Sequence, residues 1–194
     1  MRITCPIRFK VSYNFTSISQ TDVDVISYSR LQQLQRAGEV PTFTPTVSVG
    51  RGPVKIYFDF GAALPIRTSS DTSESILPVF IWVEDKGTGI LGDILNYTEN
   101  PYNALHLYVP EEFGEKSCDK FTEIISDKEG FKLYVSNQKI PMIKKKSPQL
   151  RCSFIMPNET IVPVEKAFFF SAEMNYTYDI TGEKSIEVKP TLGV

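Results

Sequence analysis

The segment AFFFSAEMNYTYDITGEKSIEV, residues 167–188, decides the fold class, because it combines the alternation of a β-strand with turn-forming residues. We expect it to form two strands joined by a turn that contains Gly182. A similar pattern, IRFKVSYNFTSISQTDVDV, occupies residues 7–25. In both segments an apolar run leads to Asn, an aromatic residue and Thr, and a polar turn and a short alternating strand follow. We therefore interpret both segments as β-hairpins that end similar structural units.

Between these segments the chain reads as one short helix and a series of short strands. A serine at 27 or 29 is suited to cap a helix over residues 29–37, and Gly38 is suited to end it. The strands are expected at residues 54–60, 76–83, 103–109, 121–125, 131–135 and 150–156. The run ILPVFIWV at 76–83 is almost wholly apolar, which predicts a central strand buried on both faces. The pattern predicts an all-β protein, an immunoglobulin-like β-sandwich with an N-terminal β-hairpin and one short helix.

A stretch rich in proline and glycine separates the helix from the strands. Residues 39–53, EVPTFTPTVSVGRGP, hold three prolines and two glycines, a composition typical of linkers and sheet edges. We therefore divide the chain into an N-terminal hairpin and helix (1–38), a linker (39–52) and a sandwich (53–194). The first part is expected to pack on the sandwich or to complete a preceding repeat.

The overall composition is that of an ordinary globular protein with balanced charge. Hydrophobic residues make up 41%, and 21 basic and 23 acidic residues give a formal net charge of −2. This balance does not favour binding to nucleic acid. No apolar run reaches the roughly 18 residues of a membrane helix, so we expect no membrane-spanning segment in the chain.

Three cysteines are present, and none belongs to a C-x-x-C pair, which argues against a zinc knuckle. The preferred pairing is a disulfide between Cys118 and Cys152, which would close a loop of about 35 residues and stabilise the fold by about 3.8 kcal/mol. Cys5 is then left over, or it pairs with one of the other two. The alternative is three reduced, buried thiols in a cytosolic protein.

Four of the seven asparagines lie in Asn-x-Ser/Thr sequons, where chance placement gives about one. The glycosylation candidates are Asn14, Asn96, Asn158 and Asn175. Glycan acceptors belong to exported chains, so we expect an extracellular or cell-envelope glycoprotein whose numbering begins after a removed signal or anchor. Accidental sequons in Thr-rich strands are the alternative.

The residues of known catalytic and binding motifs are mostly lacking. His106 is the single histidine, and in the strand ALHLYV it alternates with Leu105 and Leu107, so we expect it on the outward face. No nucleotide-binding glycine motif stands between a strand and a helix. We therefore expect no enzyme activity, no catalytic residue, no cofactor and no metal.

Residues 54–91, VKIYFDFGAALPIRTSSDTSESILPVFIWVEDKGTGIL, carry a resemblance to a known family. A strand, a proline turn and a second strand ending in the corner VEDKGTG (83–89) resemble the immunoglobulin-like, CARDB-like adhesion modules of prokaryotic and archaeal cell-surface proteins. Asp85 stands where those modules usually have Asn. The resemblance implies a surface-exposed structural or binding module, and it implies no catalytic residues.

Three functions are compatible with these features. The first is a non-catalytic structural or adhesive module of an extracellular or cell-envelope protein, with protein partners or self-association. The second is a virion or filament subunit in which the N-terminal strand pairs with the open edge of a neighbouring copy. The third is a carbohydrate-binding module that uses exposed aromatic side chains, with a glycan as its ligand.

Overall fold

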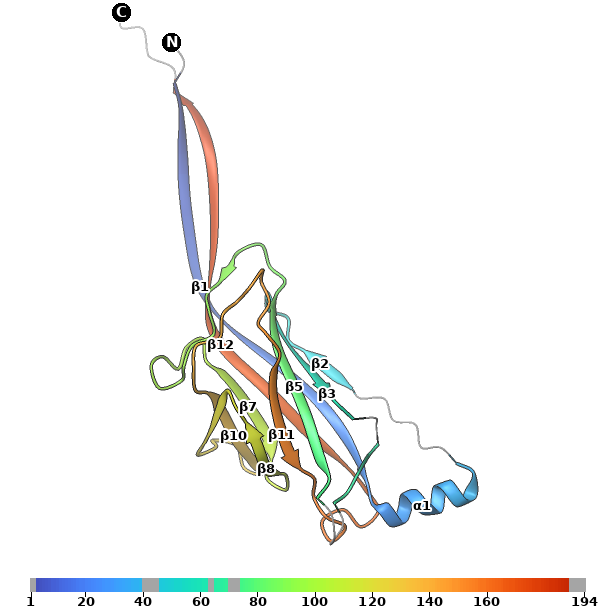
Figure 1. The fold of residues 1–194 in the computed structure, drawn as a ribbon. Helices are drawn as coiled ribbons and strands as arrows, with labels where there is room; N and C mark the ends of the chain where they lie inside the picture. Colours follow the sequence, from blue (N-terminus) through green and yellow to red (C-terminus); the bar gives the residue numbers. More distant parts are fainter. Residues whose placement is uncertain (1–2, 40–45, 63–64, 70–73, 189–194) are drawn as a thin grey trace, which may run out of the picture.

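The computed structural model describes residues 3–39, 46–62, 65–69 and 74–188, and it shows an all-β sandwich with one short helix (Figure 1). The predicted fold class is therefore confirmed. In chain order the elements are β1 (Ile3–Ile26), α1 (Tyr28–Ala37), β2 (Val47–Val49), β3 (Val54–Phe60), β4 (Ile66–Arg67), β5 (Ile76–Asp85), β6 (Ile90–Leu91), β7 (Leu105–Pro110), β8 (Gly114–Cys118), β9 (Phe121–Ile124), β10 (Phe131–Ser136), β11 (Leu150–Ile155) and β12 (Glu165–Val188).

The strands form two sheets. The larger sheet has the order β2-β1-β12-β7-β10-β9, with β4 added to β1 and β6 to β12, and the smaller has the order β3-β5-β11-β8. The core lies between them. Its centre is Phe170 of β12, which is fully buried and packs edge-on against Phe60 and Phe113, at ring-centroid distances of 5.5 and 5.1 Å. The neighbouring Phe169 is 60% exposed, as the alternation of side chains along a strand requires.

The two hairpins predicted at residues 7–25 and 167–188 are wrong. Each segment belongs to one continuous strand of 24 residues, and β1 and β12 pair with each other along their whole length, from Ile3↔Val188 to Ile26↔Glu165. The supposed polar turn of the first hairpin stays in the strand. Its buried Ser17 donates a hydrogen bond to the carbonyl of Val54 at 2.6 Å, whereas the buried hydroxyls of Ser19 and Thr21 have no hydrogen-bond partner among the described residues.

The antiparallel pairing explains why the two segments look alike. Asn14 lies opposite Thr177, and Thr16 lies opposite Asn175, so the motifs Asn-Phe-Thr and Asn-Tyr-Thr face each other across the ribbon. Gly182 makes no turn. The ring of Phe9 covers it so closely that any side chain at this position would collide with the ring. The repeat in the sequence is thus a pair of matched strands.

The short helix is as predicted. Ser27 caps α1 by accepting a hydrogen bond from the backbone N–H of Arg30 at 3.2 Å. Gly38 ends it in the left-handed conformation, with φ of 74°. No residue of α1 is buried, and Figure 1 shows the helix at the end of the sandwich opposite the chain termini.

β5 is one of the two inner strands of the smaller sheet and lies between β3 and β11, as predicted for the apolar run at 76–83. Burial on both faces is wrong, however. Leu77, Val79 and Ile81 are fully buried, whereas the alternate residues are only partly covered. Trp82, on the outer face, stacks on Tyr57 of β3 at 5.4 Å. Aromatic stacking along the sheet surface explains why this outward row is apolar too.

The expected linker at 39–52 follows β1 and α1 in the chain and precedes β3 of the smaller sheet. β1 itself pairs with β12, the last strand of the chain, in the larger sheet. Residues 40–45 of the linker lie outside the described residues. Residues Val47–Val49 form β2, which pairs with β1 on the side away from β12. This stretch therefore supplies an edge strand as well as a connection.

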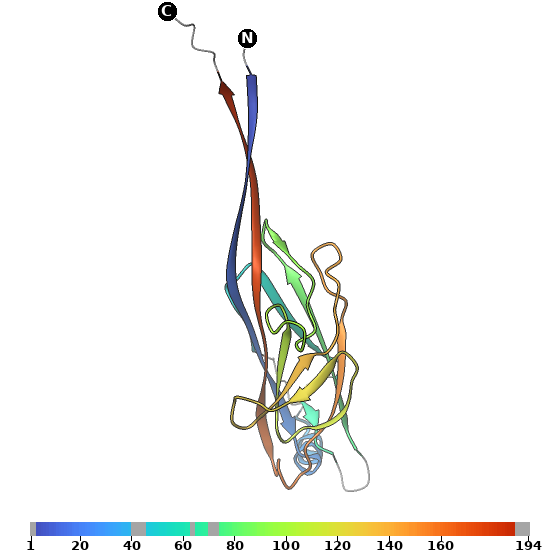
Figure 2. The same cartoon turned by 90° about the vertical axis from the view of Figure 1, so that its left-hand side faces the viewer.

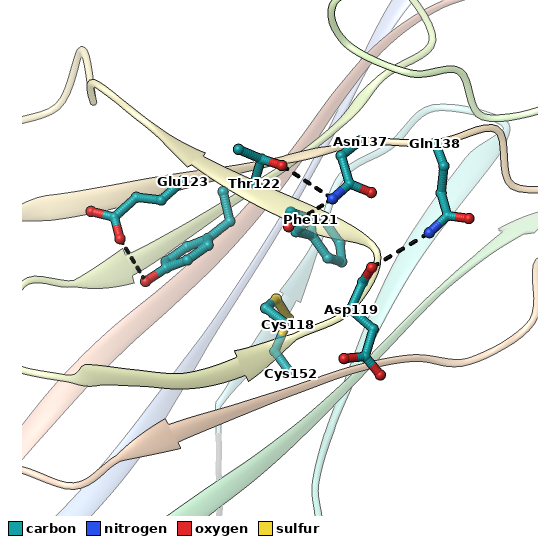
Figure 3. Close-up of a disulfide and its surroundings, with 9 residues drawn as sticks. Cys118, Asp119, Phe121, Thr122, Glu123, Asn137, Gln138 and Cys152 are labelled. Atoms are coloured by element: carbon teal, nitrogen blue, oxygen red, sulfur yellow. Dashed lines mark hydrogen bonds between the residues drawn. A yellow bond between two sulfur atoms is a disulfide. The ribbon is translucent and has the colours of Figure 1, made fainter.

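The predicted disulfide is present. Cys118 of β8 and Cys152 of β11 are directly paired across the smaller sheet, with a Cα–Cα distance of 4.2 Å (Figure 3). Cys152 is fully buried and Cys118 is 7% exposed. Next to the bond, Asn137 donates hydrogen bonds to the carbonyl of Phe121 and the hydroxyl of Thr122. The disulfide thus ties the edge strand β8 to the interior of the sheet, and Cys5 is left as an exposed free thiol.

Candidate functional site: the protruding ribbon and the groove at its base

The paired strands β1 and β12 project from the sandwich as a two-stranded ribbon (Figures 1 and 2). The last strand beside them is β6, which pairs with Tyr178 and Asp179. Beyond this point, residues 3–11 and 180–188 have only each other as strand neighbours in the described part of the chain. Isolated two-stranded ribbons are at best marginally stable in water. The stability of this ribbon therefore depends on contacts between its side chains or with a partner.

One face of the ribbon is polar and charged. Arg8 pairs with Glu183 and Lys10 pairs with Asp179, each at 2.8 Å, and Ser12 donates a hydrogen bond to Asp179 at 2.6 Å. The hydrogen bonds from Lys10 and then Ser12 lower the pKa of Asp179 below its ordinary value. Exposed ion pairs of this kind contribute little stability. This face is suited to solvent.

The opposite face of the ribbon is apolar and uncovered. Ile7, Phe9 and Val11 are 50, 52 and 50% exposed, Ile186 is 41% exposed, and the thiol of Cys5 lies in the same row. These positions continue the alternate row that is buried inside the sandwich, where Val23 and Val25 have no exposed surface. We call these five residues the apolar face. It has the composition of a core without a covering layer, and such patches mark interaction sites.

A groove of about 530 Å³ lies where the ribbon joins the sandwich. It is lined by β1, β12, β7 and the loop before β7, through Asn14, Phe15, Thr16, Tyr97, Pro101, Tyr102, His106, Asn175 and Tyr176. Tyr176 is fixed beneath it by a polar contact with the Ser17 hydroxyl at 3.1 Å and by the N–H of Val54, which donates to it at 3.3 Å.

The structure brings two of the four predicted glycosylation asparagines together in this groove. Thr16 donates a hydrogen bond to Oδ1 of Asn175 at 2.5 Å, and Thr177 donates one to Oδ1 of Asn14 at 3.0 Å. Each sequon asparagine is therefore held by the threonine of the other sequon.

The other two predicted acceptors lie in loops. Asn96 immediately precedes the groove residue Tyr97, and its Oδ1 accepts hydrogen bonds from the N–H and hydroxyl of Thr98. Asn158 is far from these residues in sequence, is exposed, and accepts a hydrogen bond from the N–H of Ile161. All four asparagines reach the surface, so their glycosylation stays a prediction.

His106 faces away from the core, as predicted, and borders the groove. Leu105 and Leu107 on either side are fully buried, whereas His106 is partly covered and contacts the Tyr97 ring at 5.3 Å. Burial lowers its pKa below the ordinary histidine value. Its Nε2 atom is buried and has no hydrogen-bond partner among the described residues.

Comparison with known proteins adds no relative. No protein-family model matches the chain, and a search of curated proteins finds no similar sequence. Within residues 3–39, 46–62, 65–69 and 74–188, no three His, Cys, Asp or Glu side chains are grouped to hold a metal ion. In the same ranges, no helix has the length and apolar character needed to cross a membrane.

Sequence reasoning missed the ribbon itself. The signal was the mirrored placement of Asn and Thr at 14 and 16 and at 175 and 177, which suits antiparallel pairing of the two segments. The same placement is also compatible with two copies of one local hairpin, which is the prediction that the pairing contradicts. The groove could not be found from sequence, because its residues come from four segments that only tertiary pairing brings together.

Proposed function

We propose that the protein is a non-catalytic structural module of an extracellular or cell-envelope assembly, and that it self-associates through the apolar face of its ribbon. The observation that carries the proposal is this face. It prolongs the buried row of the sandwich by several residues into solvent.

The exposed area is large enough to drive association, though not strongly. Full burial of a large apolar side chain is worth about 1.5–3 kcal/mol. Because Ile7, Phe9, Val11 and Ile186 are about half exposed, covering them gives about 4 kcal/mol per copy. Two copies together gain about 8 kcal/mol. The loss of translational and rotational freedom on association costs about 4–15 kcal/mol, so the gain and the cost are of similar size. We therefore expect concentration-dependent assembly.

A second copy is the partner that best matches this face. The ion pairs of the ribbon lie on its other side, and the one charged residue that alternation places with the apolar face is Lys184, opposite Ile7. Its flexible stem allows the ammonium to reach past the ribbon edge. Two such ribbons stacked face to face pack as two sheets do, about 10 Å apart. The contact is isologous, as in most homo-oligomers.

Stacking of this kind leaves β1 in its own chain. Donation of β1 to another copy would require all its pairs with β12 to open, whereas face-to-face packing requires none to open. A virion or filament subunit is compatible with the same face, and it differs in predicting open-ended rather than closed assemblies.

Three features support the extracellular and adhesive parts of the proposal. The intrachain disulfide suits an oxidising compartment. The four sequon asparagines reach the surface, where they are open to glycosylation. The resemblance of residues 54–91 to CARDB-like adhesion modules supports an adhesive role. Mass spectrometry of the protein from its native source tests this part. A glycan on any of Asn14, Asn96, Asn158 or Asn175 supports it, and reduced Cys118 and Cys152 in a chain without glycans contradict it.

Sedimentation velocity tests the association, with Cys5→Ser in every variant to exclude disulfide-linked dimers. The parent is expected to form oligomers between about 10 and 500 µM. Phe9→Ser with Val11→Thr removes the apolar face and is expected to leave a monomer. The matched control, Arg8→Ser with Lys10→Ser, changes the polar face of the same strand and is expected to oligomerise like the parent. A monomeric parent throughout this range, or equal loss of assembly in both variants, contradicts the proposal.

A further inference from the structure

The groove at the base of the ribbon combines aromatic walls with polar groups that have spare hydrogen-bonding capacity. Its volume of about 530 Å³ is within the usual range for small-molecule sites, about 300–1,000 Å³. It is separate from the apolar face, because none of the five residues of that face lines it. The groove can therefore have a function independent of self-association.

The aromatic side chains of the groove are held in place, and one is well exposed. Tyr97 packs edge-on against His106 at 5.3 Å, whereas the rings of Phe15 and Tyr176 face the core on the other side of the sheet. Tyr102 is 58% exposed at the rim. A tyrosine offers an apolar face and a polar hydroxyl, which suits a ligand with both C–H faces and hydroxyl groups.

The polar side chains are oriented by their contacts across the ribbon. The oxygens of Asn14 and Asn175 accept hydrogen bonds from Thr177 and Thr16. This leaves both amide nitrogens as donors, and neither has an acceptor in the described ranges of the chain. The unpartnered Nε2 of His106 adds a third polar atom beside the groove. Asn14 is exposed, so its amide is open to solvent, whereas Asn175 is partly buried and Nε2 of His106 is buried. Buried polar atoms normally have partners, so the imidazole nitrogen in particular points to a polar ligand.

The groove carries no charge. None of its lining residues is Asp, Glu, Lys or Arg, and burial keeps His106 neutral at pH 7 by lowering its pKa. Phosphates and acidic sugars would find no cationic partner in it. A neutral ligand that is rich in hydroxyl groups matches all of these features.

We propose that the groove binds a neutral saccharide, whose ring packs on Tyr102 and whose hydroxyl groups accept hydrogen bonds from the amides of Asn14 and Asn175. The saccharide has two possible sources with the same chemistry. It is either a free glycan, or a glycan attached to the chain at Asn14 or Asn175, both of which are sequon asparagines; in the attached case the amide nitrogen of one asparagine carries the glycan and only the other amide serves as a donor.

Titration of the chain from a non-glycosylating host tests the free source. Neutral trisaccharides of glucose, mannose, xylose and N-acetylglucosamine are added up to 10 mM, followed by calorimetry and ligand-observed NMR. At least one is expected to bind, and Tyr102→Ala is expected to weaken it at least tenfold. Tyr28→Ala is the matched control, because Tyr28 is also an exposed tyrosine, 44% accessible, and lies outside the groove; it is expected to bind like the parent. Asn14→Asp replaces a donor by a charge with little change in shape, and it is expected to weaken binding without unfolding the chain.

The glycosylated chain from the native source tests the attached source. A glycan on Asn14 or Asn175 that shows NMR contacts to the Tyr102 ring supports it. The proposal is overturned if no neutral trisaccharide binds and no such glycan is found. It is also overturned if Tyr102→Ala and Tyr28→Ala bind the same sugar equally well, or if a charged molecule such as a sialylated sugar or a peptide binds in its place.

Discussion

The disulfide between Cys118 and Cys152 allows a quantitative test of what holds the smaller sheet together. The two cysteines are 34 residues apart, and cross-linking over this distance removes about 3.8 kcal/mol of chain entropy from the unfolded state. Replacing both by alanine is therefore expected to lower the free energy of unfolding by about 4 kcal/mol. For a chain of this length that corresponds to a fall in Tm of about 8–15 °C.

Urea unfolding followed by the fluorescence of Trp82 is a suitable assay, because this single tryptophan lies in β5, next to β11, which carries Cys152. The m-value is expected to rise in the double variant, since the unfolded chain without the cross-link exposes more surface. Cys5→Ala is the control, because Cys5 is exposed and unpaired, and it should leave the transition unchanged. A loss below about 1 kcal/mol, or the same loss in the control, would refute the entropic reasoning.

Three further substitutions test other parts of the structure. Phe154→Ala empties a fully buried site in β11 and is expected to cost about 3–5 kcal/mol in urea unfolding; a cost under 1 kcal/mol would contradict this packing. Ser27→Ala removes the N-cap bond to Arg30 and is expected to lower the free energy of unfolding by about 1 kcal/mol, whereas Ser27→Asp places a charge at a fully buried position and is expected to cost more; no loss from Ser27→Ala would contradict the role of the cap. Burial and the hydrogen bond that Tyr178 donates to Asp85 raise the pKa of Tyr178 to about 12, above its unfolded value near 10, so folding stability falls as pH rises from about 10 to 12. Tyr178→Phe should be less stable than the parent at pH 8 and should lose less stability than the parent between pH 10 and 12. Thermal melts at each pH measure this, and an equal loss of stability in the variant and the parent over that range would contradict the reasoning.

The short strands could be predicted from sequence because their signal is local. Residues 54–60 alternate in polarity and end at a glycine, and β3 has the predicted bounds. The helix is likewise encoded by its own ends, Ser27 and Gly38. Three cysteines allow only three pairings, and the predicted pairing of Cys118 with Cys152 is confirmed.

The long ribbon could not be predicted in the same way, because its register depends on a partner strand at the other end of the chain. Ser17, Ser19 and Thr21 have the composition of a turn, yet they are buried in β1. That placement depends on pairing with β12 on one side and β2 on the other, and on the carbonyl of Val54, which accepts a hydrogen bond from Ser17. The exposure of Phe9 was equally invisible, since an apolar residue that alternates with polar ones looks the same whether or not a second layer covers it.

The pairing of β1 with β12 also sets the order of events during synthesis. Hydrogen bonds across the ribbon join residues 159 to 175 positions apart in the chain. At about 5–20 residues per second, β1 leaves the ribosome about 10–30 s before its partner exists. For that time the edge of this 24-residue strand that will pair with β12 stays open, and the ladder that closes it consists only of non-local contacts, which form slowly. β1 is therefore made long before its main partner, and this interval is when a chaperone or a second nascent copy would compete for it.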